Sequence, residues 1–294
     1  YSDFVAERLL RAFVGTDNGP FLLFRRRRFS HWLSDQLHEN RPYDEIVREM
    51  IAGKGTWTSN PAVNFITVTI DPDEGRPDPI RLAGRTARAF LGLRIDCLQC
   101  HDDFLGNVGL LGDDGKSRGG IQRDFHQLAA FYSGAKVTII GVDDEPAAYS
   151  VQLLGDDTET KLKPAVPFYA ELLPRKGTRR ERLAEWVTSS ENRPFARVAV
   201  NRIWALMFGR PFVEPLDSIP IHGEYPPGFE RLVDDFIQHE YDVQRLIRII
   251  ANTRVFRMDS RPAFEVLPRH EEAWAAFPLT RLRPEQVAGA VAQA

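Results

Sequence analysis

The chain has 294 residues, of which 43% are hydrophobic and 27% are charged, the composition of a globular protein with one large domain or two. Its formal net charge of -3 excludes a general electrostatic attraction to nucleic acid. No window approaches the roughly 18 consecutive apolar residues of a membrane span. The chain begins without methionine and ends inside a predicted helix at 284–294, so we expect a fragment of a longer protein.

The first predicted block, 1–135, is helical. Apolar residues recur every three or four positions in several stretches, which is typical of amphipathic helices. These stretches lie at 29–37, 44–51, 83–94 and 125–131. The third of them leads directly into Cys97, and a loop rich in glycine and aspartate is expected at 106–120.

The second block, 136–173, changes character. Runs rich in β-branched and aromatic residues predict short strands at 137–142 and 149–154. A third strand is predicted within 161–168, where Pro164 and Pro167 interrupt it. This block therefore indicates a small β insertion.

The third block, 174–294, is again helical. Its apolar stripes predict helices at 179–189, 194–208, 229–237 and 243–251. Gly209 is a stop signal for the second of these helices, and Asp242 is an N-cap for the last. The fold is thus predicted to be mainly α, a helical body built from the N- and C-terminal blocks with the small β insertion between them.

The chemistry-bearing motif is Cys97-Leu98-Gln99-Cys100-His101, which contains the only two cysteines of the chain. The pattern C-x-x-C-H is the attachment signature of a c-type haem. Two thiols three positions apart can each form a thioether with one vinyl group of the same porphyrin. The histidine that follows is then placed to ligate the iron, which makes His101 the predicted metal ligand.

Other interpretations of the motif remain open. A redox-active C-x-x-C is expected beside a βαβ pattern, whereas the approach to Cys97 reads as helix. Zinc could bind Cys97, Cys100 and His101 with one distant ligand, although no second closely spaced pair is present. A disulfide or a buried pair of thiols is the remaining alternative. We favour haem attachment.

Residues on both sides of the motif resemble a known family. The matching residues are Gly84-Arg85, Phe90-Leu91-Gly92-Leu93, the motif with Asp102, and Gln122, Asp124, Phe125, Leu128, Ala129, Ala130 and Phe131. Together with the stretch 42–53, they resemble a cytochrome-type domain of unknown function found in large secreted proteins of planctomycetes and their relatives. The third block resembles the usual C-terminal companion of that domain. The matching residues there include Leu183, Ala184, Glu185, Trp186, Asn201, Arg202, Trp204, Phe208, Gly209 and Arg210.

The resemblance implies a haem-linked, exported protein, so a periplasmic or secreted location is expected. It also implies a partner, either a redox protein or a further cytochrome module of the same polypeptide, with polysaccharide as another candidate. The chain departs from the family at two positions. Relatives often have C-x-x-C-H-D-H-P, whereas in this chain Asp103 and Phe104 follow Asp102. The companion domain often has a histidine just before Phe-Gly-Arg, whereas here Leu206 and Met207 precede Phe208.

The second axial position of the iron decides between functions, because a methionine there favours electron transfer and an open position permits oxidative chemistry. We expect an open or water-occupied position first, then His126 and then Met207 as the distal ligand. His222, in a proline-flanked loop, is a further candidate.

The sequence therefore predicts an extracytoplasmic c-type haem protein that acts in electron transfer or in a haem-dependent oxidation. Cys97 and Cys100 would hold the haem, with His101 as the proximal ligand. One alternative is a haem-free carbohydrate-processing or structural module of a large secreted protein. Another is a metal-dependent enzyme that uses the same three residues.

Overall fold

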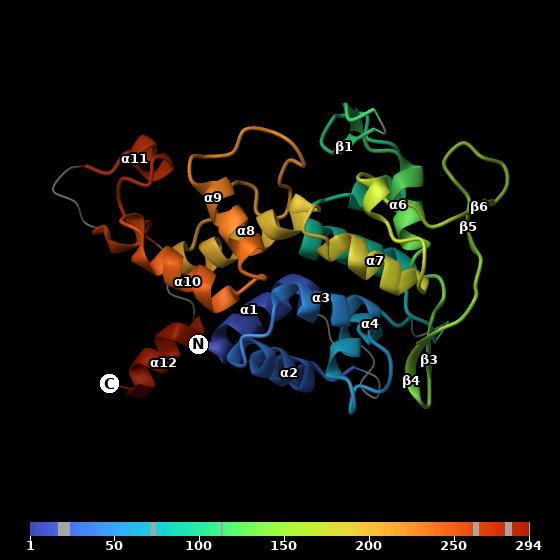
Figure 1. The fold of residues 1–294 in the computed structure, drawn as a ribbon, viewed down its shortest axis with the longest axis horizontal. Coiled ribbons are helices and arrows are strands. Elements are labelled where there is room, and N and C mark those ends of the chain that lie inside the picture. The colour runs from blue at the N-terminus through green and yellow to red at the C-terminus, as the bar shows by residue number, and fades with distance from the viewer. Residues whose placement is uncertain (17–23, 72–74, 113, 261–264, 280–283, 294) are drawn as a thin grey trace.

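A computed structural model describes residues 1–16, 24–71, 75–112, 114–260, 265–279 and 284–293 of the chain (Figure 1). The N-terminal helices are α1 (Ser2–Val14), α2 (Arg26–His38), α3 (Tyr43–Ala52), α4 (Asn64–Thr67) and α5 (Pro79–Thr86). Further along the chain come α6 (Gln122–Ala129), α7 (Arg179–Thr188), α8 (Arg193–Phe208), α9 (Phe229–Gln238), α10 (Val243–Asn252), α11 (Pro268–Glu272) and α12 (Pro284–Gln293). Short helical turns are η1 (Pro61–Val63), η2 (Ala87–Leu91), η3 (Asp96–Gln99), η4 (Ala170–Leu172) and η5 (Val255–Arg257).

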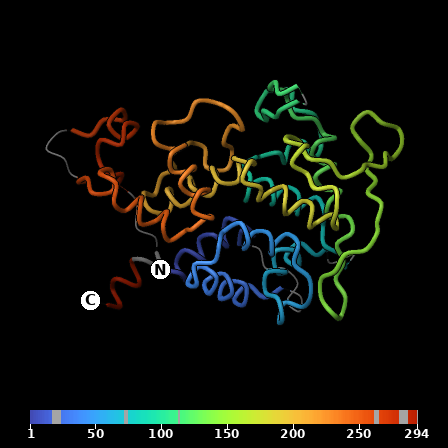
Figure 2. Tube along the Cα trace, viewed as in Figure 1, coloured from blue at the N-terminus to red at the C-terminus, as the bar shows by residue number. Residues whose placement is uncertain are grey.

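The strands pair as three small antiparallel hairpins between the helical blocks, which confirms the mainly α fold with a minor β part. They are β1 (Gly109–Leu111) with β2 (Ser117–Gly119), β3 (Ala135–Thr138) with β4 (Gly141–Asp144), and β5 (Tyr149–Val151) with β6 (Thr160–Leu162). Figure 2 shows the yellow-green β3–β6 segments at the right-hand end of the molecule and the β1–β2 hairpin at its top.

The N- and C-terminal blocks pack against each other along α3 and α7 (Figure 1). The Tyr43 ring of α3 stacks on Phe195 of α8, with ring centroids 5.5 Å apart. The Tyr43 amide also donates a hydrogen bond of 3.3 Å to the carbonyl of Tyr241. Apolar stripes that the sequence assigned to separate helices therefore meet in one core, as amphipathic helices require.

A buried arginine ties three segments together at this junction. Arg180 of α7 has a fully buried side chain and donates from Nε to the Asp144 carboxylate at 2.6 Å. Its Nη1 group donates to the carbonyls of Ile51 and Gly53 at 3.0 and 2.9 Å. A buried guanidinium is tolerated only when its charge and donors are satisfied, and these partners satisfy them.

The strands differ from the prediction in three places, two of which are hairpins where no reversal was expected. The run at 137–142 is not one strand but the β3–β4 hairpin, which reverses at Ile139 and Ile140. Gly141 has φ +104°, a value that glycine adopts without steric cost, and it lies directly against the backbone of Gly55. The loop expected at 106–120 contains the β1–β2 hairpin, which is too short to show a strand periodicity.

The third predicted strand is shorter than expected. Within 161–168 only the start of the run pairs, as β6, and the pairing ends before Pro164. A proline has no amide hydrogen to donate to a neighbouring strand, so the strand stops there. Among the described residues, no helix has the length and apolar character needed to cross a lipid bilayer.

Candidate functional site

The C-x-x-C-H motif forms a tight turn that follows the helix α5 and its π-helical extension η2. Gly92 ends η2 in the left-handed conformation, with φ 63°, so the helix predicted over 83–94 stops there. A 3₁₀ turn, η3, then carries the motif, and the amides of Cys100 and His101 both donate to the Cys97 carbonyl, at 3.2 and 3.3 Å. The turn thus brings both cysteines and the histidine onto one short segment.

The turn is anchored by its apolar residue and exposes its reactive ones. Leu98 is fully buried, whereas Cys97, Cys100 and His101 are exposed. Both cysteines are free thiols, so the disulfide alternative is not what the structure contains. The thiols are therefore accessible to a reaction partner from outside the core.

The ring of His101 has a defined orientation. Its Nδ1 lies 2.7 Å from the carbonyl oxygen of Asp102. A carbonyl only accepts hydrogen bonds, so Nδ1 carries the hydrogen and the lone pair of the neutral ring is on Nε2. The ring also stacks on Phe104, with centroids 6.3 Å apart and planes 17° from parallel. Nε2 is the nitrogen that a metal ion would bind.

The helix α6 holds the motif from behind through two side chains that are one helical turn apart. Gln122 donates from Nε2 to the carbonyl of Gln99 at 3.1 Å, and His126 reaches the same carbonyl from its Nε2 at 3.0 Å. Gln99 stands between the two cysteines, so this shared carbonyl fixes the centre of the turn. Residues four apart on a helix face the same side, which is why both reach it.

His126 is buried, and both of its ring nitrogens are engaged. Because Nε2 donates to the Gln99 carbonyl, Nδ1 accepts from the hydroxyl of Tyr149 on β5, at 2.8 Å. Burial lowers the pKa of His126 below its ordinary value, which keeps the ring neutral. The structure thus uses this histidine to join the β5–β6 hairpin to the motif.

The loop after His101 is fastened by carboxylates that accept backbone hydrogen bonds. Asp102 accepts from the amide of Gln122 at 2.7 Å, and Asp103 accepts from the amide of Val108 at 2.6 Å. The hydrogen bond from Val108 is the main reason why the pKa of Asp103 is lowered. Both carboxylates therefore hold the backbone of the loop in place.

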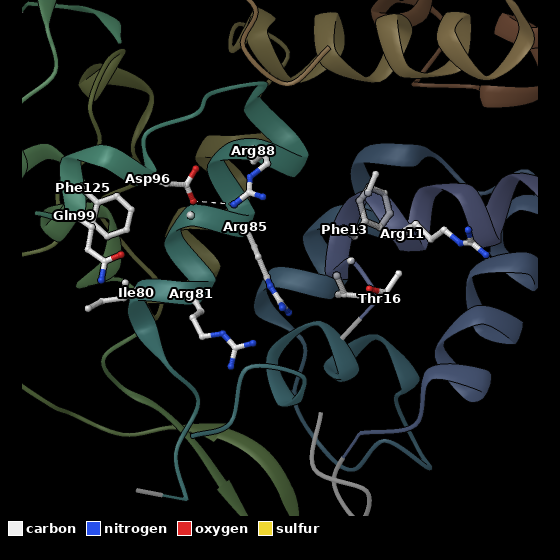
Figure 3. Close-up of a pocket in the computed structure, with 14 residues that line it drawn as sticks. Arg11, Phe13, Thr16, Ile80, Arg81, Arg85, Arg88, Asp96, Gln99 and Phe125 are labelled. Carbon is white, nitrogen blue, oxygen red and sulfur yellow. Dashed lines mark hydrogen bonds and ion pairs between the residues drawn. The ribbon is translucent and has the colours of Figure 1, made fainter. Parts of the chain in front are cut away.

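A basic cavity of about 450 Å³ lies on one side of the motif, between α1 and α5. Its charged lining consists of Arg11, Arg81, Arg85, Arg88 and Asp96. Figure 3 shows the Arg85 side chain extending from α5 toward the space that separates it from α1, and Arg88 paired with Asp96 at 2.8 Å. Gln99 also lines the cavity, so its wall includes the motif itself.

A second cavity, of about 340 Å³, lies between the loop after the motif and a loop of the C-terminal block. Its lining includes Leu110, Ile221 and His222. The His222 Nε2 lies 3.2 Å from the Tyr169 hydroxyl, and burial lowers the pKa of this histidine. Both helical blocks therefore contribute to the surroundings of the motif.

Only some of the site residues predicted from the sequence lie close together in the structure. It brings Cys97, Cys100 and His101 together, with His126 one carbonyl away. Met207 is half-buried on α8 and packs against the apolar core. Among the described residues, no group of three or more histidine, cysteine or acidic side chains is arranged to hold a metal ion.

Comparison with protein families assigns both helical blocks. Residues 1–110 match PSCyt2, described as a protein of unknown function (DUF1549), and residues 179–294 match PSD1, described as a protein of unknown function (DUF1553). The chain is a PSCyt2 domain followed by a PSD1 domain. The predicted resemblance is thereby confirmed. Comparison with curated proteins gives no match, and neither does comparison with solved structures.

The PSCyt2 match contains the whole motif, whereas α6 and the β3–β6 hairpins lie between the two matched regions. The residues that hold the motif turn, Gln122, His126 and Tyr149, therefore come from the intervening segment. The sequence offered His126 as a possible distal ligand of the iron, but it did not indicate that His126, Gln122 and Tyr149 hold the motif turn. The i, i+4 spacing of Gln122 and His126 was the available signal.

Proposed function

We propose that the PSCyt2 domain carries a c-type haem bound covalently to Cys97 and Cys100, with His101 as an axial ligand of the iron. The protein would then act in electron transfer or in a haem-dependent oxidation outside the cytoplasm. The observation that carries the proposal is the turn itself, which presents two free, exposed thiols beside a histidine whose Nε2 lone pair is available. This is the donor set that haem attachment requires.

The surroundings of the thiols fit a large apolar ligand. Phe104 is 80% exposed and Leu105 is 85% exposed, immediately after the motif. Exposed apolar side chains gathered at one place mark a surface that a ligand or partner covers. A porphyrin is flat and mostly apolar, so it would remove these two side chains from water when bound at the neighbouring cysteines.

Attachment needs no oxidant. Each thiol adds across one vinyl double bond, so that the sulfur bonds one carbon and the thiol hydrogen ends on the other. The reaction therefore requires both cysteines as thiols, and the structure contains no disulfide between them. The bound haem would supply one-electron redox chemistry.

The residues of the chain have separate tasks in this proposal. The Asp102 carbonyl holds the Nδ1 hydrogen of His101, which orients the ring and leaves Nε2 free for iron. Gln122 and His126 hold the Gln99 carbonyl, which keeps the two thiols at a fixed separation. Both nitrogens of His126 already form hydrogen bonds, so one of these hydrogen bonds would be lost if His126 became the distal ligand. An open distal position stays our first prediction.

The decisive experiment is expression in a host that carries out cytochrome c maturation, followed by acid-acetone extraction of the denatured protein. We expect the haem to remain on the protein, and a Cys97→Ala/Cys100→Ala variant to lose it into the solvent. We also expect His101→Ala to keep the thioethers but to shift the Soret band. His31→Ala, an exposed histidine on α2, is the matched control and should leave the spectrum unchanged.

Two results would contradict the proposal. Haem that partitions into the solvent from the unmodified protein would exclude covalent attachment. A protein that stays colourless in the maturation-competent host would favour the haem-free alternative, a carbohydrate-processing or structural module. The metal-dependent enzyme has weaker support, since the described residues gather no metal-binding group of three around the motif.

A further inference from the structure

The tip of the β3–β4 hairpin exposes two large apolar side chains. Ile139 is fully exposed and Ile140 is 70% exposed. Both lie at the reversal between the strands, where polar turn residues are the common choice. Two adjacent isoleucines in water cost free energy in proportion to their exposed area, so this tip is suited to a place where water is excluded.

A tryptophan framed by arginines lies beside the tip. Trp57 and Ile139 line the same small cavity of about 120 Å³. The guanidinium groups of Arg25 and Arg28 lie over the Trp57 ring, 5.0 and 5.2 Å from its centroid. Figure 1 shows α2, which follows Arg25, and the β3–β4 hairpin along the same lower edge of the molecule. Tryptophan with cationic neighbours is typical of the boundary between lipid headgroups and acyl chains.

The three carboxylates of the hairpin are already paired with cations, so they do not offset the exposed arginines at the start of α2. The hairpin pairs are Asp143 with Lys54 at 3.0 Å, Asp144 with Arg180 at 2.6 Å and Glu145 with Lys136 at 3.1 Å. Arg26 pairs with Glu7 at 3.4 Å. Arg27 and Arg28 are exposed, and they add positive charge beside the tip. An anionic surface therefore complements this edge.

We propose that Ile139, Ile140, Trp57, Arg25, Arg27 and Arg28 form a peripheral docking surface for anionic lipid. In this arrangement the two isoleucines enter the acyl-chain boundary, Trp57 lies at headgroup level, and the arginines contact lipid phosphates. The inference goes beyond haem binding and does not depend on it, since none of the six residues belongs to the C-x-x-C-H motif or to the segments that hold it.

The test is co-sedimentation of the full chain with two sets of vesicles, one of phosphatidylcholine alone and one with added phosphatidylglycerol. We expect binding to the anionic vesicles only, with an affinity that falls as salt is raised, because screening weakens the arginine contacts. Ile139→Ser/Ile140→Ser should weaken binding at least tenfold. Arg27→Gln/Arg28→Gln should weaken it and reduce its salt dependence.

Two control variants test whether binding depends on this surface or only on having exposed apolar and positively charged side chains anywhere on the protein. Leu154→Ser removes an equally exposed apolar residue, 70% exposed, from the loop between β5 and β6. Arg231→Gln removes an exposed arginine from α9. Both variants should bind anionic vesicles as the unmodified protein does.

Each of the remaining outcomes overturns the proposal. Equal binding by the Ile139→Ser/Ile140→Ser variant, or no binding to either vesicle, would exclude lipid as the occupant. A concentration-dependent dimer in light scattering that this variant abolishes would identify a second copy of the chain as the occupant. None of these results bears on the haem, because covalent attachment is measured separately by extraction.

Discussion

The motif turn and the junction between the helical blocks differ in whether their charged or reactive groups are buried. At the junction the charged group itself is buried, and Arg180 satisfies a carboxylate and two backbone carbonyls at once. In the motif turn the thiols and the imidazole are exposed, and the turn is held through buried Leu98 and through hydrogen bonds to the Gln99 carbonyl. The comparison shows that burial defines the body of this protein, whereas a few hydrogen bonds to the backbone position its reactive side chains.

The largest effect is expected from removing the buried cation. Arg180→Met would remove the donor shared by the Asp144 carboxylate and two carbonyls, and breaking a buried pair costs about 3–5 kcal/mol. A further cation near that carboxylate is Lys54, whose Nζ lies 3.6 Å away. Urea unfolding should show this loss in the free energy of unfolding. Arg231→Met, at an exposed position of α9, should change it by less than about 0.5 kcal/mol. A loss below about 1 kcal/mol for Arg180→Met would mean that water replaces the lost donors and that burial does not dominate the junction.

The next effect concerns the contact of the β3–β4 hairpin with the body. In Gly141→Ala the new Cβ would lie 2.1 Å from the Gly55 backbone, at a φ of +104°. Strain at positive φ costs about 1–2 kcal/mol, and the clash adds about 1–3 kcal/mol. Gly155→Ala is the matched control, because Gly155 has φ +89° but nothing within 4 Å of the added Cβ. Equal losses of unfolding free energy in the two variants would show that the hairpin moves away from Gly55 at no cost.

A smaller effect is expected at His126, where the motif is held. His126→Ala leaves the Tyr149 hydroxyl without its acceptor and the Gln99 carbonyl without one of its two donors, at a cost of about 1–3 kcal/mol. Under the proposed function, the same variant should attach less haem per protein after maturation, because the thiols lose their fixed separation. Gln122→Ala should act in the same direction. Normal haem content in both variants would show that the turn positions its thiols unaided.

The pKa of His126 adds a pH dependence with a definite sign. Its folded-state pKa is lowered, mainly by burial, so the unfolded chain binds a proton more readily. Above the unfolded-state pKa of about 6.5, His126 is neutral in both states and does not lower the free energy of unfolding. As the pH falls from there toward the folded-state pKa, the unfolded chain gains a proton and the free energy of unfolding decreases. His126→Gln has no titrating ring, so its unfolding free energy should fall less between pH 7 and pH 5. Parallel curves for the two proteins would contradict this role.

The fold could be predicted from the sequence because its helices have strong periodicity. The helices α7 and α8 begin and end within about a residue of their predictions, since Pro194 and Gly209 mark the ends of α8. The hairpin at Ile139 could not be predicted, because a run of β-branched residues reads as one strand. Its reversal depends on Gly141 meeting Gly55, a contact between residues far apart in the sequence.

The candidate site was predictable only where its signal is local. Cys97, Cys100 and His101 are consecutive in one motif, so their proximity follows from the sequence. The role of His126 was not predictable, since it depends on Tyr149 and on a backbone carbonyl. The sequence does contain a signal for the basic cavity, because Arg81, Arg85 and Arg88 are three or four residues apart and therefore share one face of a helix.

The smallest effect is expected at the ion pair between the motif turn and η2. Arg88 and Asp96 are 2.8 Å apart, but their side chains are 46% and 48% exposed. Water screens such a pair, so a double-mutant cycle with Arg88→Ala and Asp96→Asn should give a coupling free energy of about 0.2–1 kcal/mol that decreases in salt. Asp144→Asn with Arg180→Met gives the buried counterpart, whose coupling should be larger and less sensitive to salt. A coupling above about 2 kcal/mol for Arg88 and Asp96 would mean that charge, rather than the hydrogen bonds to Gln99, fixes the motif turn to the body.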